Sequence, residues 1–591
     1  MDGYFIKSIG SNRGKPRVWF QGLELERAGF EPGQSYEVEV RGRTLILTLN
    51  PDGSRVVTPK KVRSRTLPVI DLNSRELLAA FDGMAAVRVV VKDGAIYVLP
   101  LASELKKVER FQRLRERMEQ RQPLRIGSSS HGGGIMSHAI HEGLKRAGIA
   151  SEVRFANEIR PELLEHASAY NDAWTENTLP LAAPMQELAF DERGLAHVPQ
   201  VEIFEVGIPC SGASRAGRAK RGLGQPEDHP EVGHLVVPTL ILLNKAAPAI
   251  CVFECVPLYA TSASASILRT QLRELGYTTH ERIMSGKEWG ALENRERWCM
   301  VAVTQGIDFD FDQLMPPDPR ERRLKDILES VPLDDPRWQK FEYLVDKQER
   351  DAGKGSNFKM QIADEDSENV GTITKGYAKI RSTDWKLRHP ENPELMRLFT
   401  PVEHARLKDA PEHLLGDASI ALQHEMLGQS VVYNKFVDVG HHVGNSVNRL
   451  MGLAEIPMEG RAAAFKETLG INPEAAVLAA SVVAELSCAD QREGTYVGQI
   501  VAMGDGLLVQ QTRDGVGVLH DALAFRERPA LGSVVEVQYR DGTAYVERSK
   551  LANAATHALA RFRAMGDSIP SDYATAYDDQ VAMPVQRPRM R

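Results

Sequence analysis

Residues 124–149, LRIGSSSHGGGIMSHAIHEGLKRAGI, decide how the middle of this 591-residue chain folds. An apolar run of strand length enters a turn with three consecutive glycines, Gly132, Gly133 and Gly134, and then a segment with helical spacing of apolar residues. Glycine lets the backbone approach a ligand closely, and the N-terminus of the following helix is electropositive. The stretch therefore predicts a strand, a ligand-binding turn and a helix.

Strand-like and helix-like segments alternate through residues 124–306, which predicts a parallel sheet with helices on both faces. The next strand-like run, Val153–Glu158, ends in an acid about twenty residues past the turn. An acid at that place can bind ribose hydroxyls in a doubly wound fold, so Glu158 is a candidate ligand of a nucleoside cofactor.

A cysteine ends another strand-like run, Val201–Cys210, in the pair Pro209-Cys210. A small, flexible loop follows, and its basic side chains favour a thiolate and can contact an anion: Arg215, Arg218, Lys220 and Arg221. A thiol at the end of a buried strand, within reach of a substrate, is placed for covalent attack.

The run Ala249–Pro257 carries an acid, Glu254, at its end. The carboxyl ends of strands in an open α/β sheet line one crevice, so we expect Glu158, Cys210 and Glu254 to converge there. A thiol that faces a carboxylic acid suits attack on a ring whose nitrogen must be protonated. Further along, Arg295 and Arg297 stand just before another buried strand.

Length and composition set the frame for these segments. A chain of 591 residues is expected to form two to four domains, with no apolar run near the ~18 residues of a membrane span and no signal-peptide pattern at its start. We therefore expect a cytoplasmic protein with no membrane partner. The five cysteines form no Cys-x-x-Cys pair and His131 has no second ligand at metal spacing, so we expect neither disulfides nor a metal. The net charge of −7 confines any contact with nucleic acid to local basic patches.

Both ends of the chain read as β-rich. Residues 36–49 and 87–99 alternate around Arg-Gly and Asp-Gly turns and predict two hairpins, which follow similar lead-in segments and so indicate a weak internal duplication. This N-terminal part resembles AbrB-like and SymE-like swapped-hairpin domains, and a small structural β-domain is the alternative. A helix with Leu105, Val108, Phe111 and Leu114 on one face follows. Residues 488–550 resemble KfrB-like domains.

In order, the central segments resemble the DNA cytosine-5 methyltransferases from about residue 124 to 455. Pro209-Cys210 is similar to the nucleophile motif, Glu254-Cys255-Val256 to Glu-Asn-Val, and Glu293–Arg297 to Gln-x-Arg-x-Arg. Arg397–Glu412 is similar to the segment that closes the target-recognition region. Leu427–Val432 falls at the spacing of the family's last motif. Gly444–Val447 matches the residues of that motif more closely but lies later in the chain, so we assign the motif to Leu427–Val432.

The chain departs from the family's first motif, Asp-x-Phe-x-Gly-x-Gly-Gly. Those places hold Gly127, Ser129, His131, Gly133 and Gly134, so the cofactor-lining aromatic is missing. The acid that usually follows the third strand is absent near Pro184, Cys255 replaces an Asn, and Glu293 replaces a Gln.

The resemblance implies a Rossmann-like, S-adenosylmethionine-dependent sheet that methylates carbon 5 of a flipped cytosine in double-stranded DNA. Cys210 would be the nucleophile, Glu254 would protonate the base, and Arg297 and Arg295 would steady the base or a phosphate. The cofactor would be held by Gly132, Gly133, Gly134, Glu158, Gln429 and Ser430. The DNA would be held by Arg215, Arg218, Lys220, Arg221, Thr372 and Thr374, and the last two stand in a Thr-rich part of the recognition region.

The domains expected on this basis follow one another along the chain: an AbrB/SymE-like β-domain (1–102), a helical connector (103–123), a catalytic domain (124–306), a target-recognition region (307–396), the return of the catalytic domain (397–455), a helical linker (456–487), a KfrB-like β-domain (488–550) and a flexible tail (551–591).

Two other functions stay open at this point: an RNA cytosine-5 methyltransferase of the same fold, and a non-catalytic DNA-binding regulator whose first motif no longer holds a cofactor. The terminal domains would add DNA or protein contacts and indicate a mobile-element setting and a nucleoid-associated protein. The resemblance admits a cognate restriction endonuclease as a further partner, and the sequence names none.

Overall fold

The structure is a computed structural model. It describes residues 1–317, 321–353, 358–458, 485–489, 494–503, 507–512, 516–521, 524–525, 528–530, 533–540 and 543–548. Two compact units, Met1–Pro457 and Met458–Arg591, are each described by themselves. Residues 459–484 of the predicted linker (456–487) lie outside the described residues, as does the whole predicted tail (551–591). Among the helices that are described, none has both the length and the apolarity needed to cross a bilayer.

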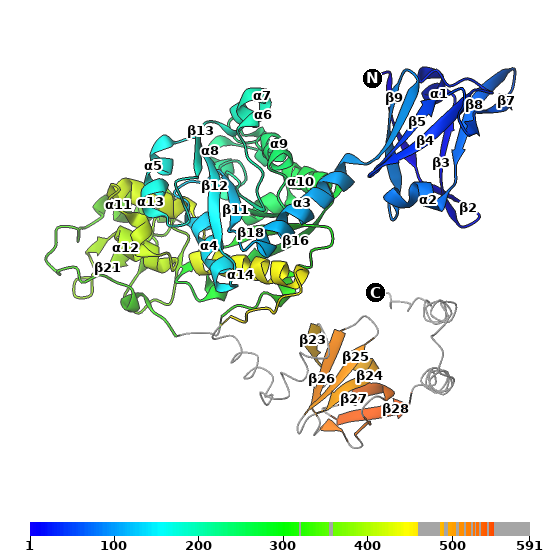
Figure 1. Ribbon diagram of the computed structural model, residues 1–591. Helices are drawn as coiled ribbons and strands as arrows, with labels where there is room; N and C mark the ends of the chain where they lie inside the picture. The colour runs from blue at the N-terminus through cyan, green and yellow to red at the C-terminus, as the bar shows by residue number, and fades with distance from the viewer. Residues whose placement is uncertain are drawn as a thin grey trace. The chain divides into compact units, whose positions relative to one another are not determined.

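The N-terminal region consists of two copies of one strand–helix–hairpin unit that exchange strands (Figure 1). The first copy contains β1 (Gly3–Ser8), β2 (Gly10–Asn12), β3 (Lys15–Gln21), α1 (Leu23–Arg27), β4 (Ser35–Arg41) and β5 (Thr44–Leu49). The second contains β6 (Arg55–Val56), β7 (Thr58–Val62), β8 (Arg65–Leu72), α2 (Arg75–Leu78), β9 (Ala86–Lys92) and β10 (Ala95–Pro100). β1 pairs with β9 of the other copy, and β6 pairs with β4. β3 also pairs with β8, and β5 with β10, which agrees with the predicted duplication and hairpins.

The central part is built on a seven-stranded sheet with the order β13-β12-β11-β14-β15-β18-β16. Its strands are β11 (Leu124–Ser129), β12 (Ser151–Glu158), β13 (Leu179–Ala182), β14 (Ile203–Gly207), β15 (Ile250–Cys255), β16 (Tyr277–Met284) and β18 (Arg297–Thr304). The first five are parallel, but β18 is antiparallel to both β15 and β16. The prediction of a parallel sheet is therefore wrong at this edge. The reason is that residues 285–296 hold one short 3-10 turn (Lys287–Trp289) and no crossover helix.

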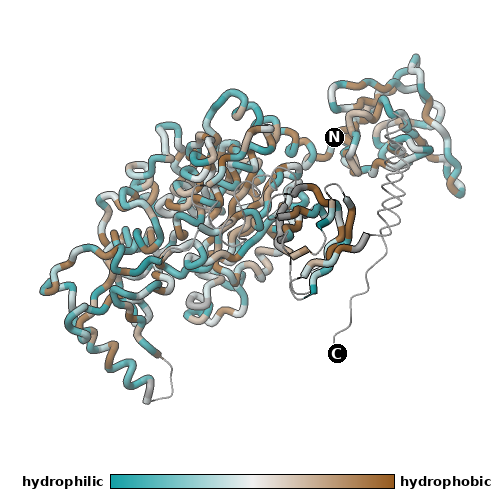
Figure 2. The backbone as a smooth tube through the Cα atoms, turned by 90° about the horizontal axis from the view of Figure 1, so that it is seen from below, coloured by the Kyte–Doolittle hydropathy of each residue, from teal (hydrophilic) through white to brown (hydrophobic). Residues whose placement is uncertain are grey.

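Helices cover both faces of this sheet. One face packs against α4 (Ile135–Arg146) and α14 (Tyr433–Leu450). The other face packs against α6 (Met185–Phe190), α9 (Val236–Ala246) and α10 (Ala263–Glu274). The remaining helices of this part are α5 (Pro161–Tyr170), α7 (Glu192–Ala196), α8 (Arg215–Arg221), α12 (Pro401–Leu407) and α13 (Ile420–Gln429). In Figure 2 hydrophobic segments gather in the interior and hydrophilic ones at the rim.

Two glycines allow α14 to pack closely along α4. A Cβ atom at Gly143 would lie 2.1 Å from the Val437 carbonyl oxygen, and one at Gly440 would lie 2.6 Å from that of Ile140. The side-chain amide of Asn448 also donates to the Ala147 oxygen at 3.0 Å. The return segment is thereby fixed to the strand–loop–helix unit that opens the domain.

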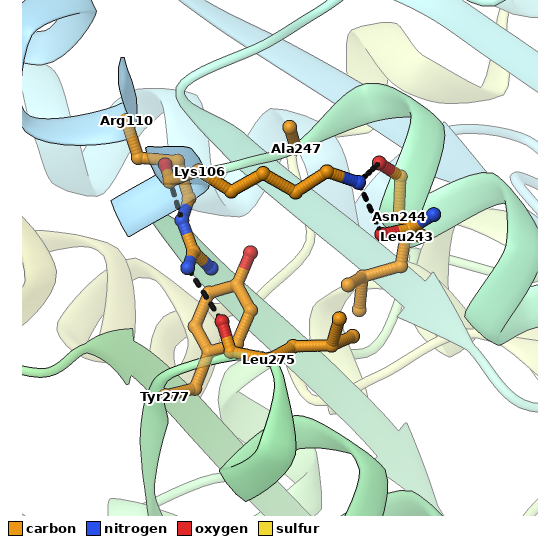
Figure 3. Close-up of a pocket in the computed structure, with 7 residues that line it drawn as sticks. All are labelled: Lys106, Arg110, Leu243, Asn244, Ala247, Leu275 and Tyr277. Carbon is orange, nitrogen blue, oxygen red and sulfur yellow. Dashed lines mark hydrogen bonds between the residues drawn. The ribbon is translucent and has the colours of Figure 1, made fainter. Parts of the chain in front are cut away.

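The connector helix α3 (Ala102–Glu119) packs on the sheet through Arg110 and Leu114. The guanidinium of Arg110 lies 4.0 Å from the centre of the Tyr277 ring and donates to the Leu275 oxygen at 2.6 Å (Figure 3). The predicted apolar face is wrong at Val108, which is 40% exposed. An arginine can take the buried place because the aromatic ring and the carbonyl satisfy its charge.

The segment between the two parts of the predicted catalytic domain forms its own small core around Leu324, Trp338, Ile373 and Tyr377. Its elements are α11 (Glu342–Gly353), β19 (Ile362–Ala363), β20 (Val370–Gly371), β21 (Lys386–Arg388) and β22 (Met396–Arg397). β20 pairs with β17 (Glu293–Asn294), which attaches this segment directly to the residues before β18.

The C-terminal unit is a six-stranded sheet with the order β23-β26-β25-β24-β27-β28. The strands are β23 (Glu485–Cys488), β24 (Thr495–Met503), β25 (Leu507–Thr512), β26 (Val516–Asp521), β27 (Val534–Arg540) and β28 (Thr543–Arg548). Its core includes Ile500, Leu508 and Val537. The β-rich character predicted here agrees with the structure.

Candidate active site

Cys210 stands on a tight turn just beyond the end of β14. The strand ends at Gly207, earlier than predicted, because Pro209 has no N–H to extend the ladder. The Ile208 N–H still donates to the Glu254 oxygen of β15 at 2.9 Å, and the Cys210 oxygen accepts from Ala213 and Ser214 at 3.1 and 2.8 Å. The Cys210 residue is exposed, so its thiol is open to a substrate.

Glu254 and Arg297 form a buried ion pair at the ends of adjacent strands. Arg297 Nε lies 2.8 Å from Glu254 Oε1, and the two residues are 8% and 7% exposed. Arg297 also donates to the Glu296 oxygen at 2.6 Å, which fixes its guanidinium. The arginine engages one carboxylate oxygen and thereby orients the other.

Cys210 and Glu254 act electrostatically on the same neighbours. Burial lowers the pKa of Arg295 to about 10 and Arg297 adds to this, whereas Glu254 and Cys210 are among the groups that raise it. Burial likewise raises the pKa of the Cys255 thiol, and Glu254 and Cys210 raise it further. Cys210, Glu254, Arg295 and Arg297 thus form one electrostatic cluster at this end of the sheet.

Arg295 is turned into the protein. Its guanidinium donates to the Ile373 oxygen at 3.4 Å and the Gly428 oxygen at 3.1 Å. It therefore ties the recognition segment and the return segment to the strand that carries Arg297. Of the two predicted arginines, Arg297 is the one that contacts Glu254 directly.

Glu293 has a buried partner that no sequence pattern predicted, Lys408. Lys408 Nζ lies 2.5 Å from Glu293 Oε2, and both side chains are fully buried. Burial would raise the pKa of Glu293, but Lys408 and Arg295 bring it below its ordinary value. Burial, and to a lesser extent the positive charge of Arg295, lowers the pKa of Lys408 to about 7. The acid in place of glutamine is thus matched by a lysine 115 positions later, which no local pattern links to it.

A second missed lysine, Lys435, is buried on α14 beside the cluster. Its ammonium donates to the Met284 oxygen at 3.1 Å. Burial, and to a lesser extent the positive charge of Arg297, lowers the pKa of Lys435 to about 7. A lysine within the apolar run Val431–Val439 was the available sequence signal.

Cys255, which replaces an asparagine, donates its thiol to the Ile208 oxygen at 3.5 Å. This weak bond holds the segment that leads to Cys210. A pocket lies behind that segment and is lined in part by Ile208, Pro209, Gly212, Ala213 and Tyr259.

The glycine turn closes against two other segments. The Gly132 N–H donates to Glu158 Oε2 at 2.9 Å, and Glu158 Oε1 accepts from Ile159 N at 3.0 Å. A Cβ atom at Gly133 would lie 2.7 Å from Met426 Sδ. Ile159, which no motif predicted, is 63% exposed beside this carboxylate.

Gln429 lies over the glycine turn, because a Cβ atom at Gly132 would come within 3.1 Å of Gln429 Nε2. Ser430 donates to the Leu427 oxygen at 2.8 Å and ends α13. Gly444 of the second motif-like stretch instead lies inside α14, where its added Cβ would be 2.5 Å from that of Ala147. This geometry favours the earlier stretch.

A buried hydrogen-bond chain runs beneath the glycine turn. Trp174 Nε1 can only donate, so His131 Nε2 accepts its proton at 3.2 Å and His131 Nδ1 must carry the hydrogen. His131 Nδ1 then donates to Ser128 Oγ at 2.8 Å, and the Ser128 hydroxyl donates to Glu205. Burial lowers the pKa of His131 to about 3 and raises that of Glu205 to about 8. The chain joins the turn to the strand that leads to Cys210.

The predicted DNA-contacting residues occupy different environments. Arg218 donates to the Leu223 oxygen at 3.5 Å and to that of Gly224, so it closes its own loop. Lys220 is exposed, and Arg221 lies 3.8 Å from Glu231. The Arg215 side chain lies outside the described part of the structure.

Both predicted threonines are exposed where the recognition segment meets the cluster. Thr372 donates to the Asn294 oxygen at 3.3 Å, and Thr374 accepts from Arg381 at 3.3 Å. Ile373 between them is buried, and its N–H donates to Glu293 at 2.9 Å. The alternation turns both hydroxyl-bearing residues outward.

Comparisons with known proteins identify what this chain is similar to. A family model described as C-5 cytosine-specific DNA methylase matches residues 136–446, and a KfrB domain model matches 495–548. The type II methyltransferase M.NlaX of Neisseria lactamica is 27% identical over 246 residues, which cover 40% of this chain and 74% of the relative. M1.ScrFI of Lactococcus lactis subsp. cremoris is 27% identical over 243 residues, 40% of this chain and 60% of the relative. The crystal structure of S. pombe Dnmt2 methyltransferase aligns with a TM-score of 0.43 and 20% identity, over 56% of this chain and 99% of that one.

Proposed function

The chain belongs to the C-5 cytosine-specific DNA methylase family, and from this premise we propose that it transfers a methyl group to carbon 5 of cytosine in duplex DNA. The observation that carries the proposal is the exposed Cys210 on the turn after β14, the strand that pairs with β15 at Glu254, and the Glu254 carboxylate that Arg297 holds at 2.8 Å. A base paired inside a duplex cannot reach a thiol set at the end of a sheet, so the cytosine must be flipped out.

The two groups divide the chemistry. The thiolate of Cys210 forms a bond to carbon 6, while Glu254, in its protonated form, delivers its proton to ring nitrogen 3, so that the electron pair becomes available at carbon 5. After carbon 5 is methylated, it loses its proton to a base, the carbon–sulfur bond breaks, and the nitrogen proton returns to Glu254. Arg297 keeps the Glu254 carboxyl directed at the ring.

S-adenosylmethionine supplies the methyl group when it is bound. The residues present fit it at the ribose side, where Glu158 offers a carboxylate anchored by the Gly132 amide and Ile159 offers an exposed apolar face. Gly132, Gly133 and Gly134 keep the turn free of side chains, and Gln429 and Ser430 border it. Ser129, in the place of the family's aromatic, is fully buried, and no described residue hydrogen-bonds its hydroxyl.

Ser129 in place of the aromatic residue is the observation that favours the alternative function, a non-catalytic DNA-binding regulator. Calorimetry with S-adenosylmethionine separates the two readings: an enzyme binds it, whereas a regulator shows no heat at about 1 mM, where even weak sites fill. Methylation of transfer RNA in preference to duplex DNA would identify the RNA methyltransferase.

Duplex DNA is the proposed partner of three surfaces. Lys220 and Arg221 are on α8, the helix that follows the Cys210 turn, and Thr372 and Thr374 lie in the recognition segment. The third surface is the N-terminal sheet β2-β3-β8-β7, whose strands carry one acid, Asp71, and five basic residues: Lys15, Arg17, Lys60, Lys61 and Arg65. Its two hairpin turns add Arg13 and Arg63. Such a surplus of positive charge suits a phosphate backbone.

Bisulfite sequencing of DNA from cells that express the protein tests the proposal. The intact chain should methylate cytosines within one short motif, and the Cys210→Ser variant should leave the same motif unmethylated. Identical patterns from both proteins would refute the enzymatic function.

A further inference from the structure

Three segments far apart in the sequence bring two histidines and an aspartate together. His138 comes from α4, Asp172 from the loop after α5, and His413 from a 3-10 turn (Glu412–Leu415). Their ligand atoms all lie within 4.8 Å of one another. His138 Nε2 is 2.5 Å from Asp172 Oδ1, which is 3.9 Å from His413 Nε2. No role in the methyl-transfer site uses this group.

The surroundings of His138 are those of an oriented metal ligand. Without a metal ion, His138 Nε2–H donates to Asp172 Oδ1, and the other nitrogen, Nδ1, faces the Tyr433 hydroxyl at 2.7 Å. When Nδ1 carries the hydrogen instead, Nε2 is free to bind a metal ion in place of that proton. The His138 side chain is 5% exposed, whereas those of Asp172 and His413 are 66% and 54% exposed. One ligand is therefore fixed, and two others can adjust beside open solvent.

We propose that His138, Asp172 and His413 bind one divalent transition-metal ion of the Zn²⁺ type, with water in the fourth position. Imidazole and carboxylate are the ligands that Zn²⁺ takes at 2.0–2.2 Å in open tetrahedral sites. Tetrahedral ligands at that distance are about 3.4 Å apart, so the two separations from Asp172 Oδ1, 2.5 and 3.9 Å, would each change by roughly 1 Å or less.

Asn171 links the proposed metal site to the glycine turn. Asn171, next to Asp172, donates its side-chain amide to the Gly134 oxygen at 3.0 Å, and Gly134 is the N-cap of α4. Near His413, the Leu414 oxygen contacts His166 of α5 at 2.9 Å. A bound ion would thus join α4, the loop after α5 and the return segment, and would hold the turn in place.

Metal titration of the untagged full-length chain tests the site, in a Cys210→Ser background because an exposed thiol is itself a metal ligand. After treatment with a chelator, calorimetry with Zn²⁺ should show one equivalent bound, and visible absorption of added Co²⁺ should report the ligand geometry. Asp172→Asn and His413→Ala should each weaken Zn²⁺ binding at least tenfold. Both side chains are largely exposed, so the variants should keep the metal-free Tm.

His141→Ala is the matched control, because its ring centre lies 6.3 Å from that of His138 but its Nδ1 is bonded to Ser151 at 2.9 Å. This variant should bind Zn²⁺ like the background protein. The proposal is overturned if Asp172→Asn and His413→Ala bind as tightly as the background, or if no saturable binding occurs below about 100 μM. Neither result bears on the methyl-transfer proposal.

Discussion

Arg297 Nε lies 2.8 Å from Glu254 Oε1, and this ion pair joins the ends of two antiparallel strands, β15 and β18. The antiparallel return of β18 is what places the arginine beside the acid. Since the arginine binds one oxygen, the acid keeps a defined direction for its second oxygen.

Replacement of Glu254 by glutamine should lower the rate of methyl transfer by about 10²- to 10⁴-fold, the range for loss of a positioned general acid. The amide keeps the shape of the side chain but cannot deliver a proton. Single-turnover methyl transfer measures the effect, with DNA affinity as the control that should change little. A rate within threefold of the parent chain would exclude the role given to Glu254.

Lys408→Met should cost about 3–5 kcal/mol of unfolding free energy, because the buried, charged Glu293 loses its 2.5 Å ion-pair partner and keeps only Arg295 at 3.5 Å. Adding Glu293→Gln should recover most of that loss, since the glutamine carries no charge. Denaturant unfolding of the two single variants and the double variant measures this cycle. If the double variant is no more stable than Lys408→Met, the two groups do not form the pair described.

Glu205→Gln should change how stability depends on pH. The pKa of Glu205 is raised to about 8 in the folded chain, so between its ordinary value of 4.5 and pH 8 only the unfolded state ionises. This carboxyl therefore costs stability as pH rises through that window, by up to a few kcal/mol, and the cost is constant above it.

The glutamine variant lacks this titration and can still accept from Ser128. Its Tm relative to the parent chain should rise from pH 5 to pH 8. A difference in Tm that stays constant across those pH values would show that Glu205 is ionised in the folded chain.

Much of the sheet could be predicted, because each strand ends in a recognisable local signal. The glycine turn after β11 and the acid at the end of β12 are examples. The direction of β18 could not be predicted, since the segment before it has no periodicity that separates a hairpin return from a crossover.

Candidate site residues could be predicted only where a reactive side chain stands at or just after the end of a strand. Cys210, Glu254 and Glu158 stand directly after apolar runs, whereas Lys408 and Lys435 reach the cluster from helices packed there by tertiary contacts. Val108 and Arg110 show the same limit: helical spacing favoured the valine for burial, but the ring of Tyr277 stabilises the arginine instead.

Lys220→Ala should reduce the salt dependence of DNA binding by about one unit of log K against log salt, as loss of one phosphate contact does. Arg218→Ala is the matched control on the same helix, and its guanidinium is already bonded to the Leu223 and Gly224 oxygens. Binding to a randomised duplex from 50 to 200 mM salt measures both slopes. Equal slopes for the two variants would place Lys220 away from the DNA.

The covalent step is tested most directly by trapping it. Fluorine at carbon 5 cannot leave as a proton would, so a randomised duplex with 5-fluorocytosine in place of cytosine should capture the enzyme in the presence of S-adenosylmethionine. We predict a denaturation-resistant adduct, with mass spectrometry placing the nucleotide on Cys210 and no adduct from Cys210→Ser. An adduct that persists in Cys210→Ser, or a parent chain that methylates DNA without forming one, would contradict the account.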